Sequence, residues 1–119
     1  MVLIVGGEGA GKRAFAKSLG YTDAQISVGE VTDLPVVEHL ERMLFADPTC
    51  GDALLSQLLT REIVVCNEVG SGIIPVDPKE RRGREATGRL CVLLAQRATT
   101  VVRMVCGIPT VIKGELPWK

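Results

Sequence analysis

Aromatic residues and an excess of charge of one sign are what this chain most clearly lacks. Its 119 residues include one Trp, one Tyr and two Phe, and 14 Lys and Arg balance 14 Asp and Glu. So few aromatic rings offer no stacking platform for single-stranded nucleic acid. A balanced charge gives no general attraction to nucleic acid or to a membrane surface. We therefore expect no nucleic-acid partner.

Metal-binding and membrane-spanning patterns are also missing. The four cysteines are widely spaced without a C-x-x-C, and His39 is the single histidine, which excludes the common zinc patterns. No apolar run approaches the roughly 20 residues of a membrane span, and the first residues show no basic leader followed by a long apolar core. These features predict a cytoplasmic protein with no membrane span.

The most informative motif is the glycine-rich run GGEGAGKR at residues 6–13, directly after the apolar segment 2–5. It matches a phosphate-binding P-loop at every position but the last. Backbone N–H groups in such a turn point inward and form an anion cradle, and Lys12 would reach the outer phosphates. The motif predicts a site for GTP or ATP. The expected nucleotide-binding residues are Gly6, Gly7, Gly9, Ala10, Gly11, Lys12 and Arg13.

Arg13 stands where the motif has Ser or Thr. A hydroxyl at this position normally helps to hold Mg²⁺, and arginine has no acceptor atom. Arg13 either adds a positive charge to the phosphate site or points outward from the helix. The loop therefore predicts phosphate binding better than it predicts turnover.

Strand-like and helix-like segments alternate along the chain. The strand-like segments are 2–5, 62–66, 100–105 and 110–113, and the helix-like segments are 11–19, 33–46, 52–59 and 78–98. This alternation predicts an α/β fold of the P-loop type, with three layers and a mostly parallel sheet flanked by helices. At this length we expect a single nucleotide-binding domain over residues 1–119.

A second motif, Asn67–Pro75, follows the strand-like segment 62–66. It places an amide and a carboxylate where open α/β sheets bind ligands, at the carboxyl end of a strand. Glu68 would hold Mg²⁺, act as a base on a substrate hydroxyl, or fix the turn by hydrogen bonds. Asn67, Gly70 and Gly72 are expected to approach the substrate.

Arginines follow at helical spacing in the segment 78–98. Arg81, Arg84 and Arg89 are expected near one helix face. They would form either a clamp for an anionic substrate or a solvated surface.

Together these motifs resemble the bifunctional adenosylcobinamide kinase/adenosylcobinamide-phosphate guanylyltransferase family of cobalamin biosynthesis. The matching segments are Gly6–Lys12, Asn67–Pro75, Arg81–Gly88 and Gly107–Lys113. The resemblance implies phosphorylation of adenosylcobinamide by ATP or GTP, followed by transfer of GMP through a guanylyl-histidine. It also implies a corrinoid ligand and a homo-oligomer, a trimer with active sites near subunit boundaries.

The chain departs from the family pattern in several places. Besides Arg13, it has Cys91 and Val92 where the family has an Asn-Gln pair, and Glu85 where Asp is usual. The middle of the chain is short, and the family's histidine segment and its Asp-Cys-Leu-Thr-Leu-Trp segment have no clear counterpart.

His39 is the single candidate for the guanylylated residue, although its surroundings do not match the family's histidine motif. It is either a nucleophile, if its segment lies against the glycine-rich loop, or a half-exposed helical histidine beside two glutamates. Two hypotheses follow. The chain is a kinase and nucleotidyltransferase using Lys12, Glu68 and His39, or a non-catalytic relative that binds nucleotide or a corrinoid as a sensor or partner.

Overall fold

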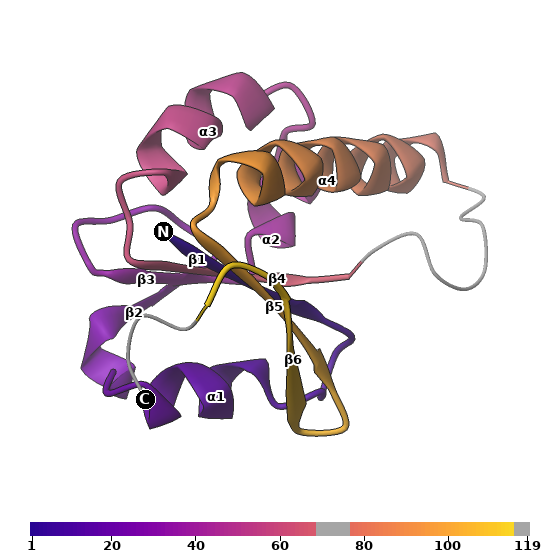
Figure 1. Ribbon diagram of the computed structural model, residues 1–119. Coiled ribbons are helices and arrows are strands. Elements are labelled where there is room, and N and C mark those ends of the chain that lie inside the picture. The colour runs from indigo at the N-terminus through magenta and orange to yellow at the C-terminus, as the bar shows by residue number, and fades with distance from the viewer. Residues whose placement is uncertain (69–76, 116–119) are drawn as a thin grey trace.

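The computed structural model describes residues 1–68 and 77–115, which are arranged around one sheet (Figure 1). The elements are β1 (Val2–Gly6), α1 (Lys12–Ser18), η1 (Asp23–Gln25), β2 (Ile26–Val28), β3 (Val36–Glu38), α2 (Glu41–Ala46), α3 (Gly51–Leu58), β4 (Ile63–Asn67), α4 (Pro78–Arg97), β5 (Thr100–Val105) and β6 (Ile108–Lys113). Within these ranges, no helix combines the length and the apolar character needed to cross a membrane.

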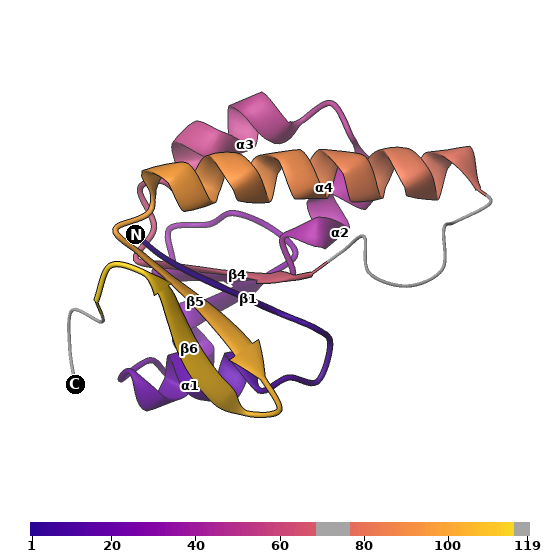
Figure 2. The ribbon, with the colours of Figure 1, turned by 45° about the vertical axis from the view of Figure 1, so that its right-hand side comes forward.

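The sheet has six strands in the order β2-β3-β4-β1-β5-β6, and the first five are parallel. β6 is antiparallel to β5 and forms one edge. β1 is central: Leu3 is paired with Val64 of β4 on one side and with Val101 of β5 on the other. The carboxyl ends of β1, β4 and β5 therefore meet at one end of the sheet, where the glycine-rich loop begins (Figure 2).

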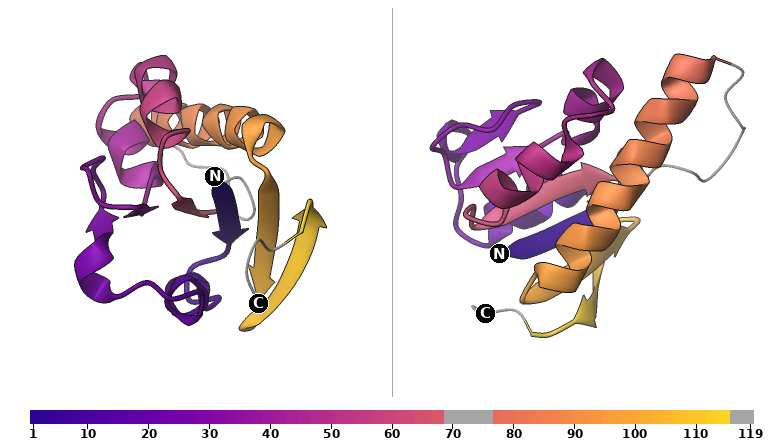
Figure 3. Two further views of the ribbon diagram at one scale, coloured as in Figure 1. Left: turned by 60° about the vertical axis from the view of Figure 1, so that its left-hand side comes forward. Right: turned by 90° about the horizontal axis from the view of Figure 1, so that it is seen from above.

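Helices cover both faces of the sheet. α1 lies against one face, and α2, α3 and α4 lie against the other (Figures 1 and 3). On the α4 face, Leu3 and Val64 pack with Leu90 and Leu94. The alternate strand residues form a separate core on the α1 face, and Ile4 packs there among residues that include Ala16. Because successive strand residues point to opposite faces, the continuous apolar strands supply both cores. The three-layer α/β fold confirms the prediction.

The side chains explain why α4 forms where it does. Asp77 accepts a hydrogen bond from the backbone N–H of Lys79 at 2.9 Å, and Pro78 occupies the first helical position, both of which favour a helix start. At the other end, the Lys113 ammonium of β6 donates to the carbonyls of Ala95 and Gln96 at 3.0 and 2.9 Å. Lys113, the last residue of the segment Gly107–Lys113 that resembles the family, therefore satisfies carbonyls at the end of α4.

The prediction of one helix over 33–46 is wrong in its first half. Val36–Glu38 is strand β3, and the helix α2 begins only at Glu41. Val36 and Val37 pair in parallel register with Ile63 and Val64 and have no exposed surface. β-Branched side chains lose rotamer freedom in a helix, so pairing in the sheet is the favoured outcome. This correction moves His39 from a helix to the carboxyl end of a strand.

Candidate functional site

The glycine-rich loop connects β1 to α1 at the carboxyl end of the sheet. Gly9 and Gly11 have φ angles of 74° and 93°, in the left-handed region that a Cβ disfavours. The loop is held from outside by a hydrogen bond of 2.9 Å from the Gly107 N–H to the Ala10 carbonyl. The predicted residues Gly6, Gly7, Gly9, Ala10 and Gly11 thus form one connected turn of defined shape.

Lys12 lies under this loop. Its ammonium donates to the carbonyl of Gly7 at 2.5 Å, and the residue is 8% exposed. Burial lowers the pKa of Lys12 below its usual range, whereas the carboxylate of Glu41 acts in the opposite direction. The hydrogen bond to Gly7 therefore positions the ammonium at the loop, and the nearby carboxylates partly offset the effect of burial on its pKa.

Arg13 is directed sideways from α1 and joins two other segments. Its Nη1 donates to Glu38 Oε2 at 2.6 Å, and its Nη2 donates to Asp23 Oδ1 at 3.1 Å. Glu38 ends β3 and is only 8% exposed. Arg13 therefore forms an ion pair at the side of the loop, where it also lines the cavity described below.

His39 follows Glu38 at the end of β3 with a φ angle of 57°. Its Nδ1 lies 3.0 Å from Oε2 of Glu41, and its Nε2 lies 3.4 Å from Oε1 of Glu38. Glu41 also accepts hydrogen bonds from Asn67, at 3.2 Å from the backbone N–H and 3.4 Å from Nδ2. A single buried carboxylate therefore holds both the histidine and the amide.

These groups surround one cavity of about 390 Å³, which we call the loop pocket. It is lined by Glu8, Gly9, Gly11, Lys12, Arg13, Ala14, Glu38, His39 and Asn67. The predicted residues His39 and Asn67 thus meet the loop. Sequence reasoning missed Glu38 and Glu41. The available signal was the pair Val36-Val37. If these valines had been interpreted as a strand, Glu38 would have been placed at the carboxyl end of that strand, and Glu41 just beyond it.

Glu68 lies elsewhere. Its carboxylate accepts hydrogen bonds from Arg103 of β5, at 2.7 Å from Nε and 3.2 Å from Nη2. It lines a second cavity of about 370 Å³, the α4 pocket, whose walls are Leu3, Val5, Asn67, Glu68, Gly88, Cys91, Val92, Ala95 and Val101. The Glu68 backbone N–H donates to the Gly6 carbonyl at 2.8 Å, but the Glu68 carboxylate does not line the loop pocket, whereas Asn67 borders both cavities.

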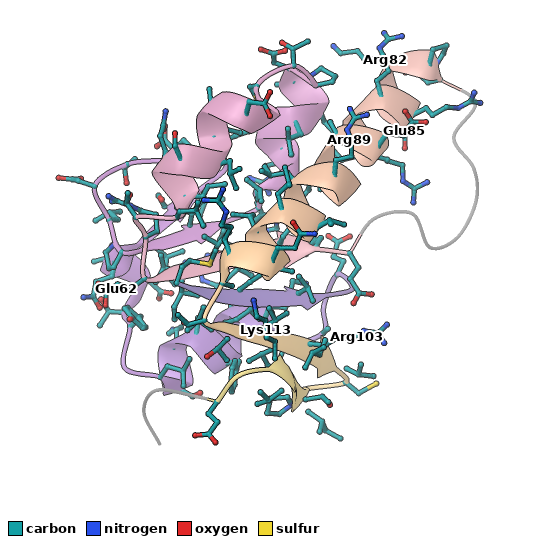
Figure 4. The ribbon with its side chains drawn as sticks, turned by 45° about the horizontal axis from the view of Figure 1, so that its top comes forward. Glu62, Arg82, Glu85, Arg89, Arg103 and Lys113 are labelled. Atoms are coloured by element: carbon teal, nitrogen blue, oxygen red, sulfur yellow. The ribbon has the colours of Figure 1, made fainter. Side chains whose placement is uncertain are left out.

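The predicted arginines spread over an arc of α4, in which Arg81 lies about 60° around the helix from Arg84 and about 80° from Arg89. Arg89 borders a cavity of about 380 Å³ against Pro48, Thr49 and Asp52, and Figure 4 shows it beside Arg82 and Glu85, turned away from β5. At 3.6 residues per turn, Arg89 lies about 140° around the helix from Arg84. Arg81 and Arg84 lie in the first two turns. Gly70 and Gly72 lie outside the described residues.

Magnesium is the metal that such a loop implies, and the side chains around the loop pocket do not fit it. Mg²⁺ requires oxygen ligands in near-octahedral geometry. Arg13 supplies no acceptor, and Oε2 of Glu38 is engaged by Arg13 at 2.6 Å. Residues 1–68 and 77–115 contain no group of three or more His, Cys, Asp or Glu side chains that could hold a metal ion.

Taken together, the fold and the loop define a three-layer α/β protein of the P-loop type. The family model described as "Cobinamide kinase / cobinamide phosphate guanyltransferase" matches residues 49–112, more than half of the chain. The chain belongs to this family.

A curated relative supports the same assignment. The chain is 38% identical over 61 residues to the bifunctional adenosylcobalamin biosynthesis protein CobP of Pseudomonas aeruginosa. The match covers 51% of this chain and 35% of the relative, so the chain spans about a third of the length of that protein.

Proposed function

We propose that this chain binds GTP or ATP in the loop pocket and transfers the terminal phosphoryl group to the hydroxyl of a cobinamide-type corrinoid. The observation that carries the proposal is the convergence of Lys12, His39 and Asn67 on the glycine-rich loop, in a chain of this family. Phosphoryl transfer depends mainly on positioning and charge stabilisation. Lys12 and the loop N–H groups can supply both without a protein nucleophile.

The size and composition of the loop pocket support this ligand class. Its volume of about 390 Å³ lies within the range of small-molecule sites. Lys12 is the buried cation there, and an incoming phosphate oxygen would replace the Gly7 carbonyl as its partner. The neighbouring α4 pocket, with mainly apolar walls that also include Asn67 and Glu68, is the place we propose for the acceptor.

We further propose that His39 is the residue that accepts the GMP group. In the tautomer that donates from Nδ1 to Glu41, the lone pair lies on Nε2, which is 3.4 Å from Oε1 of Glu38, and both residues line the loop pocket. Nε2 would attack the α-phosphorus of GTP, forming a P–N bond while pyrophosphate leaves. Glu41 would orient the ring in the way a carboxylate orients a catalytic histidine.

Calorimetric titration with GTP and ATP tests nucleotide binding directly. Lys12→Ala should abolish binding. Lys17→Ala is the matched control, because Lys17 is on the same helix but pairs with Asp23 at the surface, 3.3 Å away. If the protein binds neither nucleotide, the loop is only a turn and the proposal fails.

Product formation separates the kinase from a second candidate function. GDP or ADP formation with adenosylcobinamide, above the Lys12→Ala level, supports the kinase. Binding without product favours a non-catalytic relative that senses nucleotide or corrinoid. Arg13, which occupies the position of the hydroxyl residue that helps to hold the metal in an NTPase and is paired with Glu38, is the observation that favours this alternative.

The histidine role has its own readout. GTP labelled at the α-phosphorus should leave an acid-labile label on the protein, and His39→Asn should lose the label while still binding GTP. Retention of the label in His39→Asn would exclude His39 as the acceptor.

We also propose, from the family, that the chain forms a homo-oligomer, a trimer. β6 is an edge strand with all of its residues exposed, including Ile108 and Ile112 at 66% and 59%. Exposed apolar residues on an edge strand favour association. Light scattering coupled to gel filtration measures the oligomeric state, and a monomer at all concentrations would exclude it.

A further inference from the structure

The Arg13–Glu38 ion pair raises a question that the nucleotide-binding proposal leaves open: what supplies the positive charge that a metal ion brings to other P-loop sites? We propose that Arg13, held in place by Glu38 and Asp23, takes the role of Mg²⁺ here, so that the loop pocket binds nucleotide phosphates without a divalent cation. This inference rests on the proposed nucleotide binding and goes beyond it.

The position of Arg13 in the loop supports this role. In P-loop NTPases the residue after the loop lysine and a carboxylate on a neighbouring strand hold the metal together. Here Arg13 occupies the position of the hydroxyl residue, and it binds Glu38 at 2.6 Å. Glu38 ends β3, which β4 separates from β1 in the sheet. Arg13 and Glu38 both line the loop pocket with Lys12. The guanidinium therefore brings a positive charge to the wall of the loop pocket, between the loop and a strand carboxylate.

Arg13 also has N–H donors that are not used within the protein. A guanidinium has five N–H donors. Contacts to Asp23 and Glu38 engage one N–H at each of Nε, Nη1 and Nη2, and among the described residues no further acceptor of Arg13 is found. Two N–H groups remain on a side chain that is 40% exposed. They can donate to phosphate oxygens, for which arginine is well suited.

The Arg13 side chain is held in place before a ligand arrives. Glu38 and Asp23 come from different segments, β3 and η1, and they hold the guanidinium from two sides. Holding a flexible side chain before the ligand arrives removes part of the entropy loss on binding. The same arrangement opposes Mg²⁺, because a divalent cation at this position would lie beside a fixed positive charge with its carboxylate ligand already occupied.

The competing explanation is that Arg13 only clamps α1 to β3 and contributes nothing to the ligand. Arg13→Ser distinguishes the two. The variant removes the guanidinium, frees Glu38 and introduces a hydroxyl, which recreates the donor set that P-loop proteins use for Mg²⁺.

The experiment is titration with GTP and with ATP in EDTA and in excess Mg²⁺, on the unmodified protein and on Arg13→Ser. The unmodified protein should bind equally well in both buffers, within about threefold. Arg13→Ser should bind about 10- to 100-fold more weakly in EDTA, the loss expected for one or two charge-assisted hydrogen bonds, and should recover in Mg²⁺. Arg97→Ser, at an exposed arginine in the last turn of α4, should behave like the unmodified protein in both buffers.

Three results would overturn the inference, and they are distinguishable. Binding of the unmodified protein only in Mg²⁺ rejects the role of Arg13 but leaves nucleotide binding intact. Unchanged binding of Arg13→Ser in EDTA shows that Arg13 is only a clamp. No binding in either buffer rejects the proposed function itself. If circular dichroism shows that Arg13→Ser is unfolded, Arg13→Lys replaces it. Lysine keeps the positive charge but lacks the planar set of guanidinium donors, so this variant should bind nucleotide about tenfold more weakly in EDTA. Unchanged binding would again reject the inference.

Discussion

Cys66 Sγ lies 3.3 Å from Cys91 Sγ, across the contact between β4 and α4. Cys66 has no exposed surface, and Cys91 is partly buried. Hydrogen bonding with Cys66 lowers the pKa of Cys91, so Cys91 ionises first. Both thiols lie next to site residues, since Asn67 follows Cys66 and Cys91 lines the α4 pocket.

This pair predicts a disulfide under mild oxidation. With oxidised glutathione as the oxidant, the Cys91 thiolate should attack it, and Cys66 should then displace reduced glutathione, because the sulfurs need only approach to roughly 2.0 Å. Peptide mapping should find a Cys66–Cys91 link. Cys91→Ser should abolish the link, and exposed Cys106 serves as the internal control for reagent access. Glutathionylation of Cys106 without the link would contradict the prediction.

Tyr21, the single tyrosine of the chain, should titrate unusually late. Burial and a hydrogen bond of 2.9 Å to Glu62 raise its pKa to about 12, from 10.0. The neutral phenol is therefore favoured by folding. Its contribution to stability is complete below pH 10 and is lost as the pH rises through 12. Phenolate absorbance measures the titration while circular dichroism monitors folding.

Glu62→Gln is the variant that tests the cause of this shift. It should move the titration of Tyr21 only part of the way back, because desolvation is the larger cause. A midpoint near 10 in the folded, unmodified protein would show that Tyr21 is not held against Glu62.

Two glycines of α4 should respond oppositely to alanine. A Cβ added at Gly83 would overlap the Phe45 ring and lie 3.0 Å from the Phe45 Cα, whereas one at Gly88 would meet nothing within 4 Å. Gly83→Ala should lower the free energy of unfolding by about 1–3 kcal/mol through overpacking. Gly88→Ala should raise it by about 0.5–1 kcal/mol through helix propensity. Urea denaturation measures both, and equal effects would mean that α4 is not packed on α2 as described.

Glu41 should matter for stability through its acceptor oxygens. Its carboxylate, 7% exposed, accepts from the backbone N–H of Asn67. Glu41→Ala leaves that donor unsatisfied and should cost about 1–3 kcal/mol in unfolding free energy. Glu41→Gln retains one oxygen and should cost less. Urea denaturation of the two variants makes the comparison, and equal losses would show that the contact to Asn67 contributes little.

The fold was largely predictable where one pattern dominated locally. Three β-branched runs and the long helix gave four of the described elements, because each is continuous and bounded by clear turn residues. Segment 33–46 misled because its valines and leucines fit helical spacing as well as they fit a short strand followed by a helix. Only pairing with Ile63 and Val64 decides between them, and that pairing is not local. The three-residue strand β2 is too short to leave any pattern.

Only the part of the site that is continuous in sequence was predictable. The loop, from Gly6 to Arg13, is a local motif and could be recognised. His39 could be proposed but not placed, because its distance from the loop depends on the order of strands. The carboxylates of Glu38 and Glu41 gain their importance from partners on other segments, Arg13 and Asn67, which no spacing along the chain reveals.

Asn67 borders both the loop pocket and the α4 pocket, so its side chain belongs to the walls of both cavities. A compound that places a phosphate chain in one cavity and an apolar group in the other, joined by a short linker past Asn67, would bind as a bivalent ligand. Its second contact would form at the high effective concentration that tethering creates. The shared residue therefore suggests a chemical design, a bisubstrate inhibitor with a short linker that passes Asn67.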